Sequence, residues 1–256
     1  MPSPTFELFE SICGELHFRD SCVVTNDFLS PERLTELQDQ FEELTPDGAF
    51  AKAMVFLRGH FRKRGAELPF DFDLASRLFS VRDRAYIDFV ASVSALRGLG
   101  RRSRQFEMAT CNQFGSRATG ELYRVGWPRG TSKKAPDFNT YLRQFGFDGR
   151  VILGKEKDGG LDILWIPPLG AVPHKVIISI QCKNSSFDVE AADKSFGSAS
   201  RSLGCHRGLQ AQVHVSCVLF NDYIERKKLG KKPFNYVVLG LSDLSALRQR
   251  VTIQAL

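Results

Sequence analysis

The chain has 256 residues, of which 43% are hydrophobic and 25% are charged, and its net charge is +6 at pH 7. This composition is that of an ordinary soluble globular protein, long enough for one large domain or for two smaller ones. No apolar run reaches the roughly 20 residues of a membrane-spanning helix, and the acidic first residues do not resemble a secretory signal. We therefore expect no contact with a membrane. Because the six cysteines form no CxxC pair, we expect reduced thiols and a cytoplasmic protein.

The first hundred residues are expected to form a helical domain, over 1–100. Ser30, followed by Pro31 and Glu32, is typical of a helix start, because the serine caps free amides and proline fits the first turn. Hydrophobic residues then recur at helical spacing until Thr45-Pro46-Asp47-Gly48, which is expected to end the helix. Two further helices are expected over 49–64 and 74–96. Phenylalanine is frequent in this part of the chain, which indicates a core filled with aromatic side chains.

A second domain is expected over 101–256, after a hinge at 98–102. A helix is predicted over 104–127 and a short one over 138–145. Strand-like runs follow at 150–153, 161–166, 175–182, 213–220 and 235–239. The sequence Pro167-Pro168-Leu169-Gly170 predicts a hairpin, and a further helix is expected over 189–203. This order predicts an α/β fold with a mixed central sheet flanked by helices.

Charge is distributed unevenly along the chain. Residues 1–50 contain 11 acidic and two basic side chains, whereas residues 97–134 contain nine basic ones against only Glu107 and Glu121. A block this basic suits a phosphate backbone, because each neutralised phosphate releases counterions. A solvated face would have the same composition, so the charge block alone leaves both interpretations open. The candidate DNA-binding residues are Arg101, Arg102, Arg104, Lys133 and Lys134.

Three residues of the sequence form a candidate catalytic motif. Asp162 enters one expected strand, and Gln181 and Lys183 lie near the end of the next, on one face of it because side chains alternate along a strand. A divalent cation requires hard oxygen ligands, which Asp162, the amide oxygen of Gln181 and a main-chain carbonyl at Cys182 could supply. Lys183 would then stabilise the attacking hydroxide and the charge that develops on phosphorus. The pattern therefore suits hydrolysis of a phosphodiester bond.

The segments KDGGLDILW (157–165) and IISIQCKN (177–184) resemble the PD-(D/E)xK nuclease superfamily, and in particular its Mrr-type branch. The resemblance covers about residues 137 to 245. It implies a restriction-endonuclease-like fold and a Mg²⁺-dependent endonuclease of double-stranded DNA, with Mn²⁺ as a substitute, often of restriction or host-defence type. Two positions depart from the usual pattern, because Leu161 stands where many relatives have proline and Gln181 stands where glutamate is usual.

The resemblance also implies a glutamate on a helix that precedes Asp162. Glu121 and Glu107 both qualify, and Glu121 is preferred because it is nearer to Asp162 in the sequence. Two other functions fit the same motif: a structure-selective nuclease, such as a junction resolvase or repair enzyme, and a catalytically inactive DNA-binding module. The helical domain would contribute target recognition or dimer contacts, since a two-fold homodimer suits a palindromic target.

Overall fold

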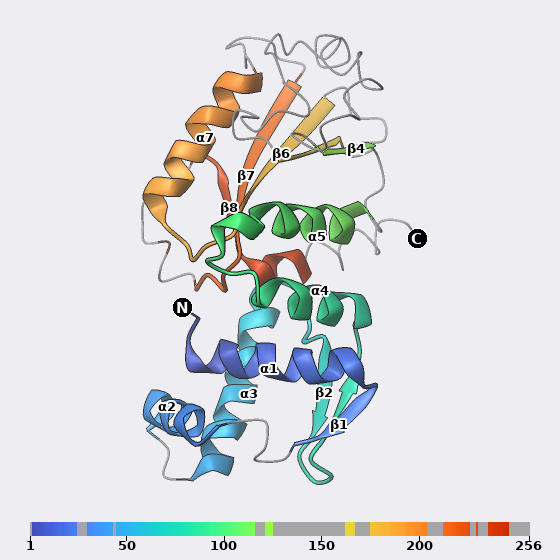
Figure 1. The fold of residues 1–256 in the computed structure, drawn as a ribbon, viewed down its shortest axis with the longest axis vertical. Helices are drawn as coiled ribbons and strands as arrows, with labels where there is room; N and C mark the ends of the chain where they lie inside the picture. Colours follow the sequence, from blue (N-terminus) through green and yellow to red (C-terminus); the bar gives the residue numbers. More distant parts are fainter. Residues whose placement is uncertain are drawn as a thin grey trace. The chain divides into compact units, whose positions relative to one another are not determined.

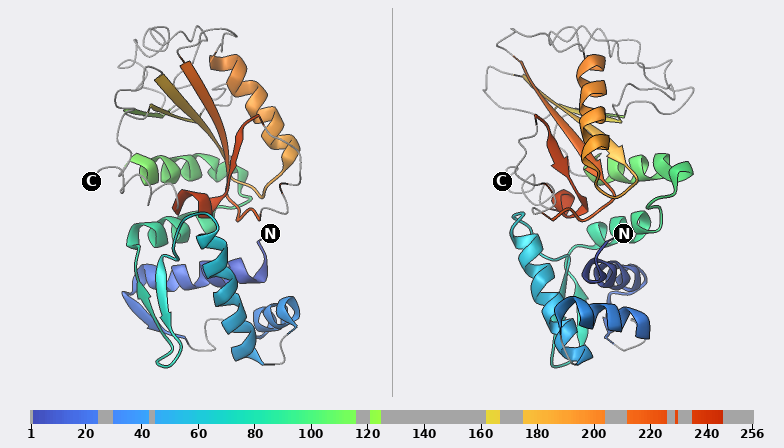
Figure 2. Two further views of the ribbon diagram at one scale, coloured as in Figure 1. Left: turned by 180° about the vertical axis from the view of Figure 1, so that it is seen from behind. Right: turned by 90° about the vertical axis from the view of Figure 1, so that its left-hand side faces the viewer.

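The computed structural model describes residues 2–24, 30–42, 45–115, 121–124, 162–166, 175–203, 212–225, 229 and 235–245. They form two compact units, whose elements are drawn in Figures 1 and 2. The N-terminal unit comprises the chain up to Gly98 and the segment that begins at Leu241, and the second unit spans Leu99–Gly240. The boundary between Gly98 and Leu99 lies within the hinge expected at 98–102. The return of the chain to the N-terminal unit at Leu241 differs from the expectation of one domain over 101–256.

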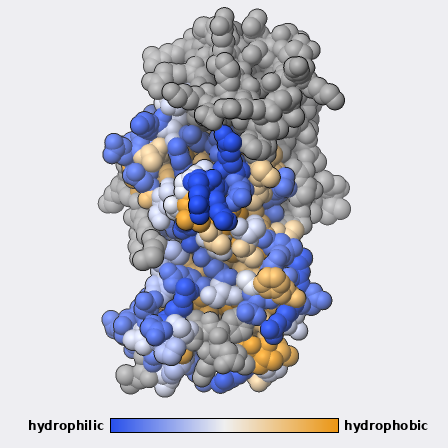
Figure 3. Space-filling model, in the orientation of Figure 1, coloured by the Kyte–Doolittle hydropathy of each residue, from blue (hydrophilic) through white to orange (hydrophobic). Residues whose placement is uncertain are grey.

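The N-terminal unit contains a sheet as well as helices, so the expectation of a helical domain is not confirmed. Its strands are antiparallel in the order β1-β3-β2. Its elements are α1 (Pro4–Phe18), β1 (Ser21–Val23), α2 (Pro31–Phe41), α3 (Pro46–Arg62), β2 (Phe70–Asp73), β3 (Leu78–Val81) and α4 (Arg84–Ser94). On the outside of this sheet the structure exposes Val23, Leu74 and Leu78, and Figure 3 shows hydrophobic surface in this area.

Helix starts in this unit follow from capping side chains. The hydroxyl of Ser30 accepts a hydrogen bond from the amide of Arg33 at 3.3 Å, which confirms the helix start predicted there. The hydroxyl of Thr45 accepts one from the amide of Gly48 at 3.2 Å. The segment 45–48 therefore starts α3 instead of only ending α2, because Pro46 fits the first turn of a helix.

A β-hairpin replaces the first part of the helix expected over 74–96. Phe70 and Phe79 are buried and face the core from β2 and β3, which matches the alternation of a strand. The carboxylate of Asp73 accepts hydrogen bonds from the amide of Ala75 and the hydroxyl of Ser76, at 3.0 and 2.6 Å. These bonds fix the turn between the strands, and a helix begins only afterwards, at Arg84.

Aromatic side chains fill the core of the N-terminal unit, as the composition predicts. Phe9 on α1 is fully buried, and its ring lies 5.3 Å from that of Phe61 and 5.7 Å from that of Phe70. Burial of one such side chain contributes about 1.5–3 kcal/mol to stability. The segment from Leu241 joins the same unit, because the hydroxyl of Tyr86 donates to the carbonyl oxygen of Leu241 at 2.8 Å.

The second unit is a mixed sheet with helices. Its strand order is β4-β5-β6-β7-β8, in which β4, β5 and β6 are antiparallel and β6, β7 and β8 are parallel. Its elements are η2 (Gly100–Arg102), α5 (Ser103–Gly115), β4 (Glu121–Arg124), β5 (Ile163–Ile166), β6 (Lys175–Lys183), α7 (Val189–Leu203), β7 (Gln212–Phe220) and β8 (Val237–Leu239). A mixed α/β sheet is thus confirmed, and so is the antiparallel pair β5–β6. The helix expected over 104–127 ends at Gly115, and the elements expected at 138–145 and 150–153 lie outside the described residues.

Helix α7 connects β6 to β7 and covers one face of the sheet, as Figures 1 and 2 show. Ala192 on α7 packs into a cluster with Val218 and Phe220 of β7. Parallel neighbours in register point to the same face, so Gln181 and Lys183, the partners of Val218 and Phe220, lie on the α7 face of β6. No helix in the described part of the chain is long and apolar enough to span a membrane.

Candidate active site

Asp162 is fixed beside Gln181 by two hydrogen bonds. It lies directly before β5 and is only 5% exposed. Its amide donates to the carbonyl oxygen of Ile180 at 3.2 Å, and its carboxylate accepts from the amide of Cys182 at 2.6 Å. Ile180 and Cys182 are the two neighbours of Gln181 in β6. The structure therefore brings together the acid and the glutamine that the sequence motif singled out.

Gln181 presents a buried oxygen atom that has no hydrogen-bond partner in the described part of the chain. Alternation along β6 puts its side chain on the face of Lys183, while Ile180 and Cys182 are buried on the other face. A buried acceptor without a partner costs about 1–3 kcal/mol. An amide oxygen held in this way next to a carboxylate is a suitable ligand for a hard cation.

Lys183 is the last residue of β6, and its side chain is half-buried. Its carbonyl oxygen accepts a hydrogen bond from the amide of Asn221 at 2.8 Å, directly after β7. This bond fixes the main chain of Lys183 at the strand end. The ammonium group is thus carried by a rigid element on the same face as Gln181, which is what a charge-stabilising lysine requires.

Cys182 faces α5, on the opposite side of β6 from Gln181 and Lys183. Burial raises the pKa of its thiol well above the usual value, and the charges of Asp162 and Glu107 raise this pKa further, while the hydroxyl of Thr110 lowers it. The thiol points away from the face that carries Gln181 and Lys183. Only the main-chain carbonyl of Cys182 fits the ligand role that the sequence suggested.

The helical glutamate of the motif is better matched by Glu107 than by Glu121. Glu121 lies on strand β4 and pairs with Ile166 of β5. Ile166 lies three residues from the end of β5 that is next to Asp162, a distance of about 10 Å along the strand. The expectation that it is helical is wrong. Glu107 lies on α5, and its charge acts on the thiol of Cys182 together with that of Asp162. Nearness to Asp162 along the chain favours Glu121, but here it does not correspond to nearness in space.

The donor set fits a magnesium ion in part. The described residues contain no group of three His, Cys, Asp or Glu side chains that could hold a metal. Mg²⁺, however, usually keeps several waters and uses only one or two carboxylates. Asp162 with the unpartnered oxygen of Gln181 and a main-chain carbonyl meets that requirement.

The basic residues of η2 and α5 adjoin the end of β6. The side chains of Arg101, Arg102 and Arg104 are exposed. The side-chain amide of Asn184, the residue after Lys183, donates to the carbonyl oxygen of Leu99 at 3.2 Å. This bond ties the start of the basic segment to the strand that carries Gln181 and Lys183. Lys133 and Lys134 lie outside the described residues.

Two asparagines near the site were not singled out by the sequence reasoning. Asn184 directly follows β6 and Asn221 directly follows β7, and both are buried. The signal that could have identified them is position, because parallel strands end at the same edge of a sheet and polar residues there meet.

Comparison of the chain with protein-family models, with curated proteins and with solved structures found no significant match.

Proposed function

We propose that the protein is a metal-dependent endonuclease that hydrolyses phosphodiester bonds of double-stranded DNA, of a restriction or host-defence type. The observation that carries this proposal is the arrangement of Asp162, Gln181 and Lys183. The carboxylate is hydrogen-bonded beside the glutamine, the glutamine oxygen lacks a partner in the described part of the chain, and the lysine follows on the same face. A strand with only a structural role has little reason to bury an amide oxygen without a partner.

Each of the three residues has a distinct task in this proposal. Asp162 and Gln181 would hold Mg²⁺, or Mn²⁺ in its place, with the main-chain carbonyl of Cys182. The cation, when bound, would polarise the scissile phosphate and lower the pKa of a nearby water. Lys183 would place a positive charge beside the phosphate, where negative charge increases in the transition state. Glu107 lies on the α5 side of β6, across the strand from Gln181 and Lys183, and of the two candidate glutamates it is the one whose charge acts beside Asp162.

The fold order supports the same proposal. A helix (α5), three antiparallel strands (β4, β5 and β6), a second helix (α7) and a parallel strand (β7) follow one another along the chain. We propose that this order is that of a restriction-endonuclease-like fold. We also propose that the protein acts in the cytoplasm. The N-terminal unit would contribute target recognition or the contacts of a homodimer.

A plasmid digest tests the proposal. Wild-type protein is incubated with supercoiled DNA in Mg²⁺, in Mn²⁺ and in EDTA, and the expected result is cleavage in the two metals only. Asp162→Asn should abolish cleavage, whereas Asp188→Asn, at an exposed acid of the same unit, should not. Full cleavage by Asp162→Asn would overturn the assignment. Discrete fragments from linear duplex support restriction, and nicking confined to branched DNA supports a structure-selective nuclease.

A catalytically inactive DNA-binding module is the second candidate, because Gln181 supplies an amide where the resemblance implies a carboxylate. Gln181→Glu decides between the two. If the wild type already cuts, this variant should remain active in Mg²⁺ or Mn²⁺, because it supplies a stronger oxygen ligand. If the wild type binds duplex DNA without cutting in either metal and the variant is equally inert, the inactive module is the correct interpretation.

A further inference from the structure

A charged cleft lies between helix α3 and strand β2 of the N-terminal unit, and no residue discussed as part of the active site lines it. Its volume is about 440 Å³, and Phe70 contributes to its apolar floor. Figures 1 and 2 show that α3 and β2 lie next to each other. The charged groups that line it are Arg58, Arg62, Glu67, Asp71 and Arg82.

The two acids of the cleft are already engaged. Arg82 donates to the carboxylate of Glu67 at 2.7 Å and also to that of Asp71. One guanidinium group thus holds both carboxylates on the β2 side of the cleft. The acids are therefore positioned by Arg82 and make no ion pair with Arg58 or Arg62.

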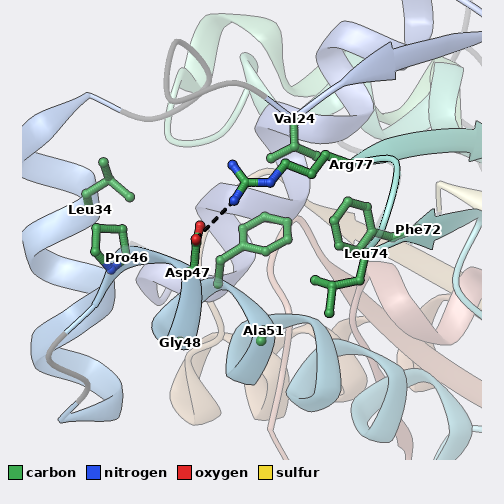
Figure 4. Close-up of a pocket in the computed structure, with 10 residues that line it drawn as sticks. Val24, Leu34, Pro46, Asp47, Gly48, Ala51, Phe72, Leu74 and Arg77 are labelled. Carbon is green, nitrogen blue, oxygen red and sulfur yellow. Dashed lines mark hydrogen bonds and ion pairs between the residues drawn. The ribbon is translucent and has the colours of Figure 1, made fainter.

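Arg58 and Arg62 differ from every other arginine of the described N-terminal unit. Seven of its nine arginines form an ion pair with a carboxylate, and these two side chains have no hydrogen bond or ion pair to any described residue. They lie four residues apart on α3, where like charges on the same helix face repel each other. Figure 4 shows the contrasting case of another pocket of the same unit, of about 390 Å³, in which Arg77 is paired with Asp47.

We propose that Arg58 and Arg62 bind a phosphate group in this cleft. The lining carries three positive and two negative charges, so one anionic group would neutralise it. A guanidinium group donates two parallel hydrogen bonds to a phosphate, and two guanidinium groups four residues apart can share its oxygens. The hollow shape concentrates the positive potential and relieves the repulsion between the two arginines once an anion is bound.

The phosphate can come from the backbone of duplex DNA or from a free phosphate compound, and the chemistry of the site is the same in both cases. The DNA source rests on the function proposed above, whereas phosphate binding does not. A contact from the N-terminal unit to the backbone would set affinity and leave the choice of sequence to other residues.

The test uses the full chain with Arg58→Gln and Arg62→Gln combined. A matched control, Arg19→Gln with Arg33→Gln, removes the same charge from exposed positions of the same unit. Affinity for a duplex oligonucleotide is measured by fluorescence anisotropy over a range of salt concentrations. Thermal unfolding is measured in parallel with and without pyrophosphate, as the free source. Because the two arginines are exposed and have no partner among the described residues, the double variant should fold with the melting temperature of the wild type.

If DNA supplies the phosphate, the slope of log affinity against log salt should become shallower by about one to two units in the cleft variant. The control should keep the wild-type slope. If only the stabilisation by pyrophosphate disappears, the ligand is a free phosphate compound. If the cleft variant keeps both the wild-type slope and the wild-type response to pyrophosphate, the proposal is overturned. Cleavage is recorded separately with Asp162→Asn, so failure of this site and failure of the nuclease proposal remain distinguishable.

Discussion

The side-chain amide of Asn221 donates a hydrogen bond to the side-chain oxygen of Asn184 at 2.8 Å. The two residues directly follow β7 and β6, so this bond joins the ends of two parallel strands. Asn184 also donates to the carbonyl oxygen of Leu99, and the amide of Asn221 donates to the carbonyl oxygen of Lys183. The pair therefore connects the strand end that carries Lys183 to the start of the basic segment.

Asn184→Ala should destabilise the protein by about 1–3 kcal/mol, because it removes the hydrogen bond of the buried side-chain amide of Asn221 and the bond to the carbonyl oxygen of Leu99. Urea unfolding of the variant measures this change. Asn112→Ala, at an exposed position of α5, is the matched control and should be close to wild type. A value for Asn184→Ala within 0.5 kcal/mol of the control, a difference typical of ordinary surface positions, would show that the connection is not structural.

Lys183→Ala should bind duplex DNA with nearly the wild-type affinity and lose cleavage by a factor of about 10² or more. The reason is that removal of a single group that stabilises transition-state charge costs about that much in rate. Initial cleavage rates in Mg²⁺ provide the measurement. Lys194→Ala removes an exposed lysine of α7 and should cut normally. Wild-type cleavage by Lys183→Ala would remove this residue from the centre.

Glu107→Gln and Glu121→Gln separate the two candidate glutamates. The charge of Glu107 reaches Cys182 beside Asp162, whereas Glu121 pairs with Ile166 at the far end of β5. Cleavage should therefore fall at least tenfold more in the Glu107 variant than in the Glu121 variant at equal protein stability. The reverse order would restore the preference that follows from sequence distance alone.

The elements around the candidate site could be predicted because each has a local signal. The strand that ends in Gln181 and Lys183 alternates polar and apolar side chains, and α7 was placed at its observed bounds, 189–203. The hairpin β2–β3 could not be predicted in the same way. Its turn contains no glycine, proline or asparagine, and Arg77 adopts a positive φ of 53°, which glycine or asparagine usually provides.

Long-range contacts account for the other differences. Nothing near Leu241 in the sequence indicates that its carbonyl oxygen accepts a hydrogen bond from Tyr86, 155 residues earlier. Similarly, Glu107 is farther than Glu121 from Asp162 along the chain, yet it is the helix α5 that packs beside β6. Spacing along a strand or helix is visible in the sequence, whereas the choice of packing partner depends on the whole fold.

His60 offers a test of stability against pH. Its Nε2 lies 2.6 Å from the hydroxyl of Ser242, and its Nδ1 lies 3.2 Å from a guanidinium nitrogen of Arg64. Because arginine can only donate, Nδ1 accepts and Nε2 carries the proton. Burial lowers the pKa of His60 to about 3, and the charges of Arg64 and Lys63 contribute to the same shift.

The folded protein therefore keeps His60 neutral at pH values where the unfolded chain binds a proton. Its contribution to stability is complete above the unfolded pKa of about 6.5 and is lost as pH falls from there toward 3. The melting temperature of the wild type should fall more steeply over this range than that of His60→Gln, which cannot titrate. Ser242→Ala keeps the buried imidazole and should keep the steep dependence. Equal slopes for wild type and His60→Gln would contradict the assignment.

The basic block of residues 97–134 does not act as one unit. Arg97, its first member, is nearly buried and forms an ion pair with Glu10 of the acidic N-terminal segment. Arg101 and Arg102 are exposed on η2, and their guanidinium groups make no ion pair within the described residues. Part of the block thus neutralises the N-terminal acids, and the part nearest to Asn184 and the end of β6 remains available for phosphate.

Arg101→Ala with Arg102→Ala should weaken binding to all duplex sequences alike and leave the cleavage site unchanged. Phosphate contacts set affinity without reading bases, and each one lost should reduce the slope of log affinity against log salt by about 0.9. Anisotropy titrations at several salt concentrations measure the slope, and sequencing of the cleaved ends checks the site. Arg33→Ala with Lys194→Ala removes two exposed charges elsewhere and should retain the wild-type slope. An unchanged slope in the Arg101 and Arg102 variant would mean that these side chains face solvent, and that DNA follows another surface of the second unit.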